Sequence, residues 1–445
     1  MNKSYKGYWS MSEIRKVETD MELLEKVLSK ENLNNAYKQV YKNKGSSGVD
    51  GVTVEELFAY IKEHKEEILW QIRNRKYKPQ PVRRVYIPKE NGKMRKLGIP
   101  SVIDRVIQQA IVQVLTPIYE EQFSNNSFGF RPKCSCEMAV IKALECFNDG
   151  YDWIVDIDLQ SFFDEVNQDK LIGIIRRTVK DGNLVSLIRK FLQSGVMEKG
   201  VIQETKKGTP QGGNLSPLLS NIMLNELDKE LEKRGLNFVR YADDCLIMVK
   251  SEKAANRVME SITTFITKKL GLVVNVEKSK VARPNQIKYL GFGFYKKINQ
   301  NIWRPKPHIK SVQKFKTKLK GILIRGRSVS LDERLLKLKQ LIYGWVNYFR
   351  ISDMKILLKE IDQWVRRKLR VIIWKQWKKI RKRYTCLRKL GISHRDAYVT
   401  SNSRKGYYHI AHTPVLEQAI SKERLNKRGL VNSLDHYLKV HIITN

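Results

Sequence analysis

Four aspartates in two short stretches are the residues of this chain best suited to do chemistry. Asp156 and Asp158 lie in WIVDIDLQSFFDEV, and the adjacent pair Asp243 and Asp244 lies in FVRYADDCLIMV. Both stretches are otherwise apolar and predict buried strands, where a carboxylate without a partner is rarely tolerated. Because side chains alternate across a strand, Asp156 and Asp158 are expected on the same face. Asp243 meets them there if the two strands are neighbours in one sheet.

Carboxylates gathered on one face repel one another unless cations lie among them. Mg²⁺ is the expected cation, because it prefers oxygen ligands and completes its coordination shell with substrate phosphates. Two such ions about 4 Å apart activate an attacking 3′-oxygen and stabilise a leaving pyrophosphate. The aspartates therefore predict nucleotidyl transfer assisted by two Mg²⁺ ions.

The charge balance of the chain indicates a polyanionic partner. Its 445 residues include 84 Lys and Arg against 46 Asp and Glu, a formal net charge of +38. Such a field attracts polyanions and repels basic partners. Nucleic acid is the expected partner, and an anionic membrane surface is the weaker alternative, because no strongly amphipathic terminal anchor is visible.

The excess charge is concentrated in residues 296–390, which hold 29 basic against 5 acidic residues and five of the eight tryptophans. The spacing of apolar residues in this segment predicts long helices with charged outer faces. A lysine-rich surface facing only solvent is the alternative, but such surfaces normally carry both signs. The segment is therefore interpreted as a basic helical module that follows nucleic-acid phosphates.

Upstream of this module, helices and short hairpins alternate irregularly. Residues 1–80 are predicted to be mostly helical with a turn at Asn43–Gly51, and Ser101–Glu121 carries a long helical pattern. Val82–Ile87 and Lys93–Gly98 predict a β-hairpin. This mixture predicts an α+β fold rather than a doubly wound parallel sheet. The polar tail, 391–445, is expected to form a small helical unit.

Cysteine and histidine spacing gives no support for a structural metal or for disulfides. The five cysteines are Cys134, Cys136, Cys146, Cys245 and Cys386, and none forms a CxxC pair. Cys134 and Cys136 lack the second pair or the histidine that would complete a zinc site, so reduced thiols are expected. The first residues, MNKSYKGYWSMSEIRK, lack a secretory signal, and no apolar run reaches membrane-spanning length, so an intracellular protein is expected.

Several motifs, in family order, make the chain similar to the reverse transcriptase–maturases encoded by bacterial group II introns. The resemblance rests on YADD at Tyr241–Asp244 together with Tyr77–Ile111, NSFGFRPKCS at Asn126–Ser135, DLQSFFD at Asp158–Asp164, KKGTPQGGNLSPLLSN at Lys206–Asn221, NVEKSK at Asn275–Lys280 and YLGFGF at Tyr289–Phe294. LNNAYKQVYKNKGSSGVDGVT resembles the family's N-terminal extension, and LIYGWVNYF resembles its thumb or maturase region. One motif is weak evidence, but an ordered series covering nearly the whole chain is strong.

The resemblance implies a right-hand polymerase with an antiparallel palm sheet, followed by helical domains. The expected divisions are an N-terminal extension at 1–50, fingers and palm at 51–295, a basic thumb and maturase domain at 296–390, and a small DNA-binding region at 391–445. The absence of paired cysteines and histidines near the C-terminus makes the chain similar to proteins of class C introns, which lack an endonuclease domain.

The family's metal ligands are implied at four positions. Asp158, rather than Asp156, corresponds to the first metal carboxylate, because a pair of phenylalanines follows it at the matching distance. Asp243 corresponds to the second, with Asp244 less directly engaged, and the backbone carbonyl of Leu159 completes a metal shell. Asp156 is left with a supporting role.

Further positions are implied to contact the nucleotide. Phe163 is the expected steric gate, whose ring collides with a ribose 2′-OH, while Phe162 is expected to pack in the core. Lys89 and Arg95 flank the predicted hairpin turn and are expected to hold the triphosphate. Gln211 lies in a glycine turn and is expected to contact the dNTP or the minor-groove side of the base pair, and Lys278 is expected to assist pyrophosphate departure.

Basic residues are implied to contact nucleic acid. Arg131 either contacts the template or triphosphate, or braces the fingers, and the sequence does not separate these alternatives. The remaining expected contacts are Lys316, Lys320, Arg366, Arg367, Lys378 and Lys379.

The resemblance implies an RNA-directed DNA polymerase of the bacterial cytoplasm that binds its group II intron RNA and assists its splicing. It would copy that RNA into DNA from a target DNA primer, using dNTPs. Three alternatives share some of these features. A stand-alone retron or diversity-generating enzyme is not expected to carry both the extension and the basic module. A splicing-only maturase typically loses the carboxylates, and a viral RNA polymerase places a small or polar residue at the position of Phe163.

Overall fold

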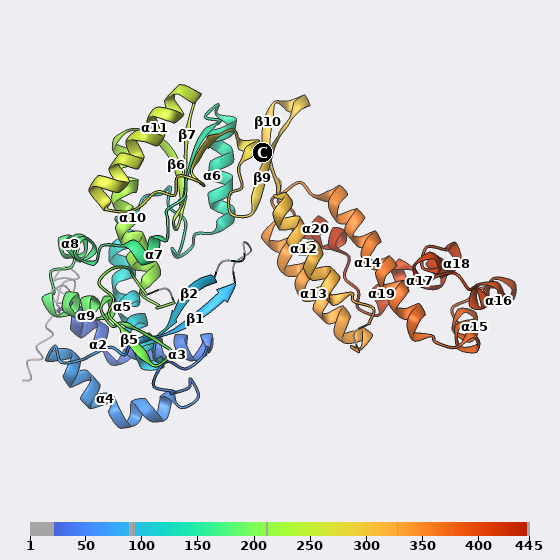
Figure 1. The fold of residues 1–445 in the computed structure, drawn as a ribbon, viewed down its shortest axis with the longest axis horizontal. Coiled ribbons are helices and arrows are strands. Elements are labelled where there is room, and N and C mark those ends of the chain that lie inside the picture. The colour runs from blue at the N-terminus through green and yellow to red at the C-terminus, as the bar shows by residue number, and fades with distance from the viewer. Residues whose placement is uncertain (1–21, 89–91, 93, 211, 327, 443–445) are drawn as a thin grey trace, which may run out of the picture. The chain divides into compact units, whose positions relative to one another are not determined.

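The computed structural model describes residues 22–88, 92, 94–210, 212–326 and 328–442. The chain divides into two compact units (Figure 1). Unit 1 comprises Met1–Ala143 and Tyr151–Ala282, and unit 2 comprises Leu144–Gly150 and Arg283–Asn445. The mixture of helices with small sheets confirms the α+β class and the palm sheet predicted from the sequence.

The helices of unit 1 are amphipathic and build most of its core. They are α2 (Leu23–Leu28), α3 (Lys30–Asn43), α4 (Leu57–Arg73), α5 (Val102–Glu120), α6 (Cys136–Asn148, whose last residues belong to unit 2), α7 (Phe162–Glu165), α8 (Gln168–Thr178), α9 (Gly182–Leu192), α10 (Ser216–Lys233) and α11 (Glu252–Phe265), which continues into the π-helical turn η1 (Ile266–Leu270).

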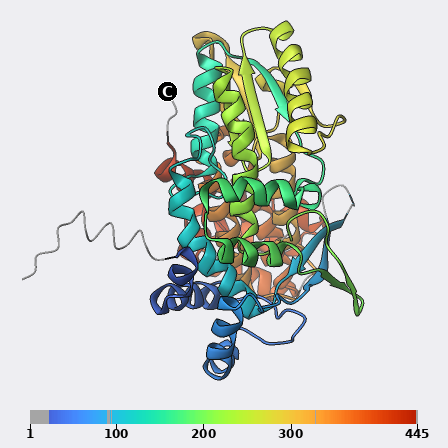
Figure 2. The same cartoon turned by 90° about the vertical axis from the view of Figure 1, so that its left-hand side faces the viewer.

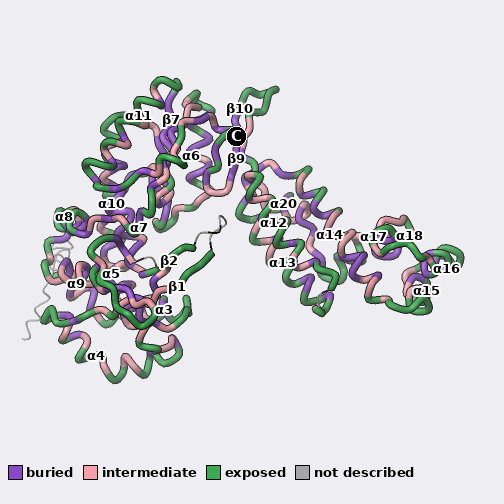
Figure 3. The backbone as a smooth tube through the Cα atoms, in the orientation of Figure 1, coloured by how far each residue is buried: buried purple, intermediate pink, exposed green. Residues whose placement is uncertain are grey.

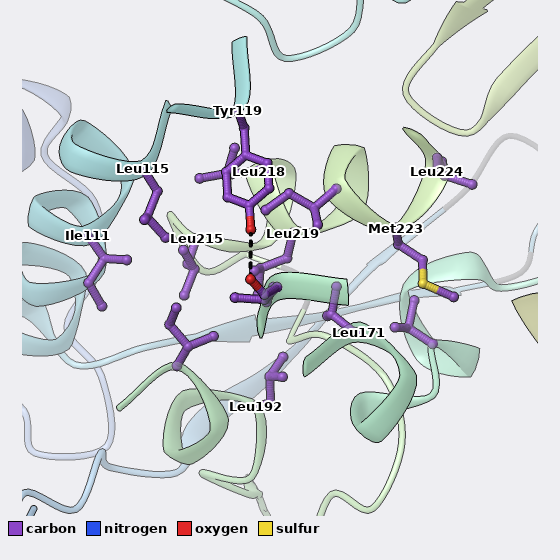
Figure 4. Close-up of a cluster of buried hydrophobic side chains, with 14 of the residues drawn as sticks. Ile111, Leu115, Tyr119, Leu171, Leu192, Leu215, Leu218, Leu219, Met223 and Leu224 are labelled. Atoms are coloured by element: carbon purple, nitrogen blue, oxygen red, sulfur yellow. Dashed lines mark hydrogen bonds between the residues drawn. The ribbon is translucent and has the colours of Figure 1, made fainter. Parts of the chain in front are cut away.

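The long α5 is the centre of this packing. Its N-cap Ser101 accepts a hydrogen bond from the backbone N–H of Asp104, and the helix buries residues along most of its length. Figure 4 shows leucines of α8, α9 and α10 packed beside α5, with the Tyr119 hydroxyl donating to the carbonyl of Ile175 at 3.4 Å. This core also includes buried residues of β3, β6 and β7, so the helices and the second sheet share one hydrophobic core.

The first sheet of unit 1 has the strand order β2-β1-β4-β5. Its strands are β1 (Val82–Pro88), β2 (Met94–Ile99), β4 (Val196–Glu198) and β5 (Val201–Gln203). β1 and β2 pair antiparallel from Arg83↔Ile99 to Pro88↔Met94, which confirms the hairpin predicted there. β1 pairs parallel with β4, so a segment more than a hundred residues later extends the hairpin into a sheet.

The second sheet has the order β6-β7-β3-β8 and is antiparallel throughout. Its strands are β3 (Trp153–Ile157), β6 (Asn237–Tyr241), β7 (Asp244–Val249) and β8 (Lys280–Ala282). β7 is buried after its first residue, and α11 packs against β3, β7 and β8 (Figures 1 and 2). Both carboxylate-bearing stretches therefore belong to one sheet.

Unit 2 begins with a β-hairpin and continues as helices. The hairpin pairs β9 (Phe292–Lys297) with β10 (Ile302–Pro307), and the 3₁₀ turns η2 (Pro284–Gln286) and η3 (Ile298–Gln300) precede and connect them. The helical prediction for 296–390 was wrong over this hairpin. Pro305 and Pro307 argue against a strand, but a two-stranded sheet has only edges, where proline is tolerated.

The helices of unit 2 follow in sequence order. They are α12 (Ile309–Ile322), α13 (Leu331–Tyr348), α14 (Lys355–Gln376), α15 (Ile380–Lys389), α16 (His394–Asn402), α17 (Tyr407–Ile410), α18 (Pro414–Ala419), α19 (Lys422–Lys427) and α20 (Ser433–Val440). Buried and exposed residues alternate along α12, α13 and α14, as Figure 3 shows. Asp362 of α14 accepts hydrogen bonds from the backbone N–H groups of Ser433 and Leu434, so α20 is capped by α14.

Across the described ranges, no helix combines the length and the apolar character needed to cross a membrane.

Candidate active site

The register of the second sheet brings the two aspartate stretches together. β3 pairs with β7 through Asp156↔Leu246 and Ile157↔Cys245, which confirms that the two strands are neighbours. Continuing this antiparallel register by one residue sets Asp158 opposite Asp244. Tyr241 pairs with Asp244 across the β6–β7 hairpin, so Ala242 and Asp243 form its two-residue turn. Asp158, Asp243 and Asp244 therefore meet at one end of the sheet.

Asp158 is held by the segment that precedes β8. Its backbone N–H donates to Oγ of Ser279 at 3.1 Å, and its backbone carbonyl accepts from the N–H of Asn275 at 2.8 Å. Nζ of Lys278 lies 3.2 and 3.3 Å from the two carboxylate oxygens of Asp158. The NVEKSK stretch therefore both fixes the backbone of Asp158 and places a positive charge on its side chain.

The environment of the aspartates opposes their ionisation. Desolvation, with the neighbouring carboxylates of Asp243, Asp156 and Asp158, raises the pKa of Asp244 to about 7, although Asp244 keeps exposed surface. Desolvation also raises the pKa of Asp243 and brings the pKa of Asp156 to about 6. Lys280, which is opposite Asp156 in β8, opposes the latter shift. Acids that raise one another's pKa are suited to a site that gains cations.

The donor set of this cluster fits a hard divalent cation. Within the described residues, no group of three His, Cys, Asp or Glu side chains is arranged as a preformed metal cage. The candidate donors are carboxylates from β3 and the β6–β7 hairpin, with the buried Leu159, which forms a β-bridge with Val274, directly after Asp158. Oxygen ligands on two adjoining strands suit Mg²⁺, which takes few protein ligands and retains water or phosphate oxygens.

Phe163, five residues after Asp158, packs against the hydrophobic core from its edge. It is half-buried, whereas Phe162 is 2% exposed, and the two rings meet edge to face at 5.3 Å between centroids. The carbonyl of Phe163 accepts from the N–H of Thr209 at 2.7 Å. A ring that is fixed at its backbone and partly accessible is suited to limit the shape of a bound nucleotide.

In the glycine loop, the glycines on either side of Thr209, Gly208 and Gly212, approach other backbones closely. Gly212 has φ of +115°, and a Cβ there would lie 2.3 Å from the carbonyl oxygen of Gly98 in β2. A Cβ on Gly208 would lie 2.7 Å from the carbonyl oxygen of Phe163. Only glycine permits this packing, so the loop joins β2 to the segment that carries the aromatic pair.

The predicted triphosphate contacts are only partly within the described residues. Lys89 and Gln211 lie outside them. Arg95 of β2 is exposed, and its charge lowers the pKa of Asp243 against the desolvation that raises it. Arg95 is thus close enough to the aspartates to interact with a charged ligand bound there.

The guanidinium of Arg131 makes its contacts with residues of unit 1. Its guanidinium pairs with Glu120 at 3.0 Å and donates to the carbonyl oxygens of Ser124 and Ser127, and its side chain is 9% exposed. Of the two roles left open by the sequence, these contacts favour the bracing role.

The other predicted nucleic-acid contacts lie on helices of unit 2. Lys316 and Lys320 are exposed on α12, four residues apart, and Lys378 and Lys379 are exposed between α14 and α15. Arg366 and Arg367 are half-buried on α14, and Arg366 donates to Oδ1 of Asn432 at 3.2 Å. The four lysines have the greater access to a polyanion.

Arg240 was missed by the sequence analysis although it directly precedes the YADD motif. It is 0% exposed and forms an ion pair with Asp228 of α10, which is also 0% exposed. The available signal was an arginine in the middle of an apolar strand, where a charge needs a buried partner.

Comparison with known proteins matches two successive parts of the chain to two family models. Residues 87–294 match the family model described as reverse transcriptase (RNA-dependent DNA polymerase), and residues 312–391 match the model described as group II intron, maturase-specific domain. The first match contains the aspartates, Phe163 and the glycine loop. The second contains α12 to α15.

Individual relatives agree with these matches. Protein YkfC of Escherichia coli is 33% identical over 276 residues, covering 54% of this chain and 72% of the relative. The group II intron-encoded protein LtrA of Lactococcus lactis subsp. cremoris is 34% identical over 323 residues, covering 58% of this chain. The chain spans 54% of the length of LtrA. A solved Cas6-RT-Cas1–Cas2 complex is similar only at 22% identity and a TM-score of 0.36.

The two family matches follow one another along the chain, and the paired strands β3 and β7 lie within the first of them. The chain therefore belongs to the family of group II intron-type reverse transcriptase–maturases, whose enzymes are RNA-directed DNA polymerases and use divalent metal ions.

Proposed function

We propose that this protein copies a group II intron RNA into DNA, using Asp158, Asp243 and Asp244 to hold two Mg²⁺ ions. The observation that carries this proposal is the pairing of β3 with β7, which gathers these carboxylates at one sheet end inside the reverse transcriptase domain. The carbonyl of Leu159 is a further donor. When bound, the ions supply the Lewis acidity that activates a primer 3′-hydroxyl and stabilises the leaving pyrophosphate.

The residues around the aspartates have separate roles in this proposal. Arg95, with Lys89, neutralises the triphosphate of the incoming dNTP. Gln211 adjoins the base pair from the glycine loop. Lys278, which contacts Asp158, would supply a proton to the departing pyrophosphate.

We further propose the domain roles expected from the sequence. Residues 1–50 extend the fingers and palm at 51–295, the basic domain at 296–390 holds intron RNA, and 391–445 contacts target DNA. In this role the protein assists splicing in the bacterial cytoplasm, and the target strand supplies the primer. The exposed lysines of α12 and of the connection between α14 and α15 support an RNA-holding surface, because exposed positive charges can contact backbone phosphates.

A splicing assay with the flanking intron RNA tests the maturase part of this proposal. Adding the purified protein is expected to accelerate excision of the intron at low Mg²⁺, where the RNA alone splices poorly. An unrelated intron RNA of equal length is the control. Equal splicing with and without the protein would contradict a maturase role and leave the polymerase assignment standing.

Replacing Phe163 with alanine is expected to weaken discrimination against ribonucleotides. The half-buried ring is the proposed sugar gate, and removing such a steric contact changes selectivity by about tenfold to a hundredfold. The measurement is the ratio of kcat/KM for a dNTP to that for the matching rNTP. Phe162→Leu is the control, because its ring faces the core and its change should lower stability without altering this ratio. An unchanged ratio in Phe163→Ala would place the sugar gate elsewhere.

The rate of DNA synthesis at limiting Mg²⁺ is expected to rise with pH through about 7. Asp244 has a pKa of about 7, and its ionised form is the one that binds a cation. Because the cation favours that form, raising the Mg²⁺ concentration should move the midpoint to lower pH. The pH profile of primer extension at two Mg²⁺ concentrations measures both effects. A flat profile between about pH 6 and pH 8 at limiting Mg²⁺ would contradict the titration of Asp244.

Stability should show the opposite trend in the absence of Mg²⁺. Below about pH 7 folded Asp244 binds a proton that the unfolded chain, with an ordinary aspartate pKa of 3.8, has already released. The folded state therefore binds more protons, and the free energy of unfolding falls as pH rises between these values. Mg²⁺ should consequently raise the melting temperature more above pH 7 than below it.

A further inference from the structure

A buried polar network lies beneath the β6–β7 turn that carries Asp243. We propose that Arg240, with Asp228, Asn221 and Gly129, sets the position of this turn, and that Arg240 is a positioning residue for DNA synthesis. The inference rests on the proposed role of Asp243 as a metal ligand. In this inference the four residues hold the backbone of the turn in place, and the aspartates bind the cation.

The ion pair at the centre of the network is fully removed from solvent. Nε of Arg240 donates to Oδ1 of Asp228 at 2.7 Å, and Nη2 donates to Oδ2, so the pair is bidentate. Both side chains are 0% exposed. Burying two charges costs desolvation that their attraction offsets only with good geometry, and apolar residues of similar volume often give equal stability. A contribution to stability alone therefore does not account for this pair.

The remaining nitrogen of Arg240 holds the turn itself. Nη1 donates to the carbonyl oxygen of Ala242 at 2.9 Å and to Oδ1 of Asn221 at 3.0 Å. The Ala242 carbonyl belongs to the peptide group that continues into Asp243. Ala242 has φ of 56°, an uncommon conformation for alanine that persists where surrounding contacts enforce it. The guanidinium thus fixes the peptide from which the Asp243 side chain projects.

Gly129 supports the same turn from another side. Its carbonyl oxygen accepts from Nδ2 of Asn221 at 2.7 Å, so Asn221 links it to Arg240. A Cβ on Gly129 would lie 2.2 Å from the backbone nitrogen of Ala242. The backbone of Arg240 also bonds to the same segment, donating to the carbonyl of Asn126 at 2.9 Å and accepting from the N–H of Phe128 at 2.8 Å. The turn is therefore enclosed by side-chain and backbone contacts.

Three variants separate positioning from stability. Arg240→Lys keeps the charge facing Asp228 but loses the planar fork that reaches Asp228, Asn221 and Ala242 together. The double variant Arg240→Met with Asp228→Leu replaces the buried charges by apolar groups of similar size, so that the protein folds without the bond to Ala242. Gly129→Ala removes no polar group. Gly129 does not have a positive φ, so alanine causes no backbone strain there, and the effect of the added Cβ is to push against the backbone of Ala242 in the turn.

Tyr77→Phe is the matched control for lost stability. Tyr77 is 7% exposed and donates to Oδ1 of Asp104 at 2.7 Å, so its change also removes a buried hydrogen bond from unit 1. That bond involves neither the β6–β7 turn nor Asp158, Asp243 or Asp244.

Two readouts are measured well below the melting temperature of each variant. The first is hydrogen exchange, by mass spectrometry and without Mg²⁺, in peptides that span residues 237–249. The second is the Mg²⁺ concentration that half-saturates primer extension on an RNA template. The three variants are expected to exchange hydrogen faster in this segment. They are also expected either to need about tenfold to a hundredfold more Mg²⁺ for half-saturation or to lose activity by about the same factor, which is the usual effect of removing groups that orient metal ligands. Tyr77→Phe should change neither readout.

The inference is overturned if Arg240→Lys and Gly129→Ala retain wild-type exchange in 237–249 and wild-type Mg²⁺ dependence. It is also overturned if the variants change only the melting temperature, as the Tyr77→Phe control is expected to do. Failure of the proposed function is a separate result, because it appears as DNA synthesis that survives replacement of Asp243 itself.

Discussion

Replacing Asp243 with alanine is expected to reduce the rate of RNA-templated DNA synthesis by about 10⁴-fold, the scale seen when one member of a catalytic group is removed. Asp243 projects from the β6–β7 turn toward the end of the sheet that carries Asp158 and Asp244. Without it the site loses one of its few oxygen donors for a divalent cation. The measurement is the rate of primer extension on an RNA template at saturating dNTP and Mg²⁺.

Stability is expected to respond in the opposite direction. Desolvation and the charge of Asp158 raise the pKa of Asp243, so the folded protein is destabilised by the ionised side chain. Asp243→Ala should therefore melt at or above the temperature of the unchanged protein when Mg²⁺ is absent, and it should bind RNA normally. Asp169→Ala is the matched control, because Asp169 is an exposed acid that pairs with Arg189 on the surface. Synthesis retained by Asp243→Ala would refute the metal-site assignment.

Replacing Lys316 and Lys320 together with alanine is expected to give the second largest effect, a weaker and less salt-dependent binding of RNA. Both lysines are exposed on the same face of α12. Removing each lysine–phosphate interaction should reduce the slope of log affinity against log salt concentration by about one. The measurement is the affinity for intron RNA at several salt concentrations.

A matched pair of lysines is available on another helix. Lys229 and Lys233 of α10 are exposed and also four residues apart, but α10 also holds the four acids Glu226, Asp228, Glu230 and Glu232, and Lys229 pairs with Glu226 at 3.4 Å. Their replacement should leave the salt dependence nearly unchanged. Equal reductions of the slope in the two double variants would show that only net charge matters and would contradict a defined RNA-binding face on α12.

Local patterns were sufficient for much of this fold and for the main residues of the site. Period-two alternation around Asp156 and Asp158 predicted a strand, and the apolar residues around Asp243 and Asp244 predicted a second buried strand. The structure has β3 and the β6–β7 hairpin at these places, paired in one sheet. The contrast between Phe162 and Phe163 was implied by the family resemblance, and the structure has Phe162 buried and Phe163 half-buried.

Features that depend on distant segments were not predictable from such patterns. The pairing of β1 with β4 joins residues far apart in the chain, and neither strand signals its partner. Arg240 is a charged residue in an apolar strand that the sequence analysis missed, and nothing local indicates that Asp228 neutralises it or that its Nη1 reaches Ala242. The hairpin at β9 and β10 was hidden because its prolines oppose strand formation everywhere except at an edge.

The most direct test of this account is primer extension by the unchanged protein on an RNA template with an annealed DNA primer, dNTPs and Mg²⁺. The carboxylates at the end of the β3–β7 pair, within the reverse transcriptase domain, predict full-length DNA product that disappears when EDTA is added or when rNTPs replace dNTPs. A primer that stays unextended, or one that is extended equally well without a divalent cation, would contradict the account.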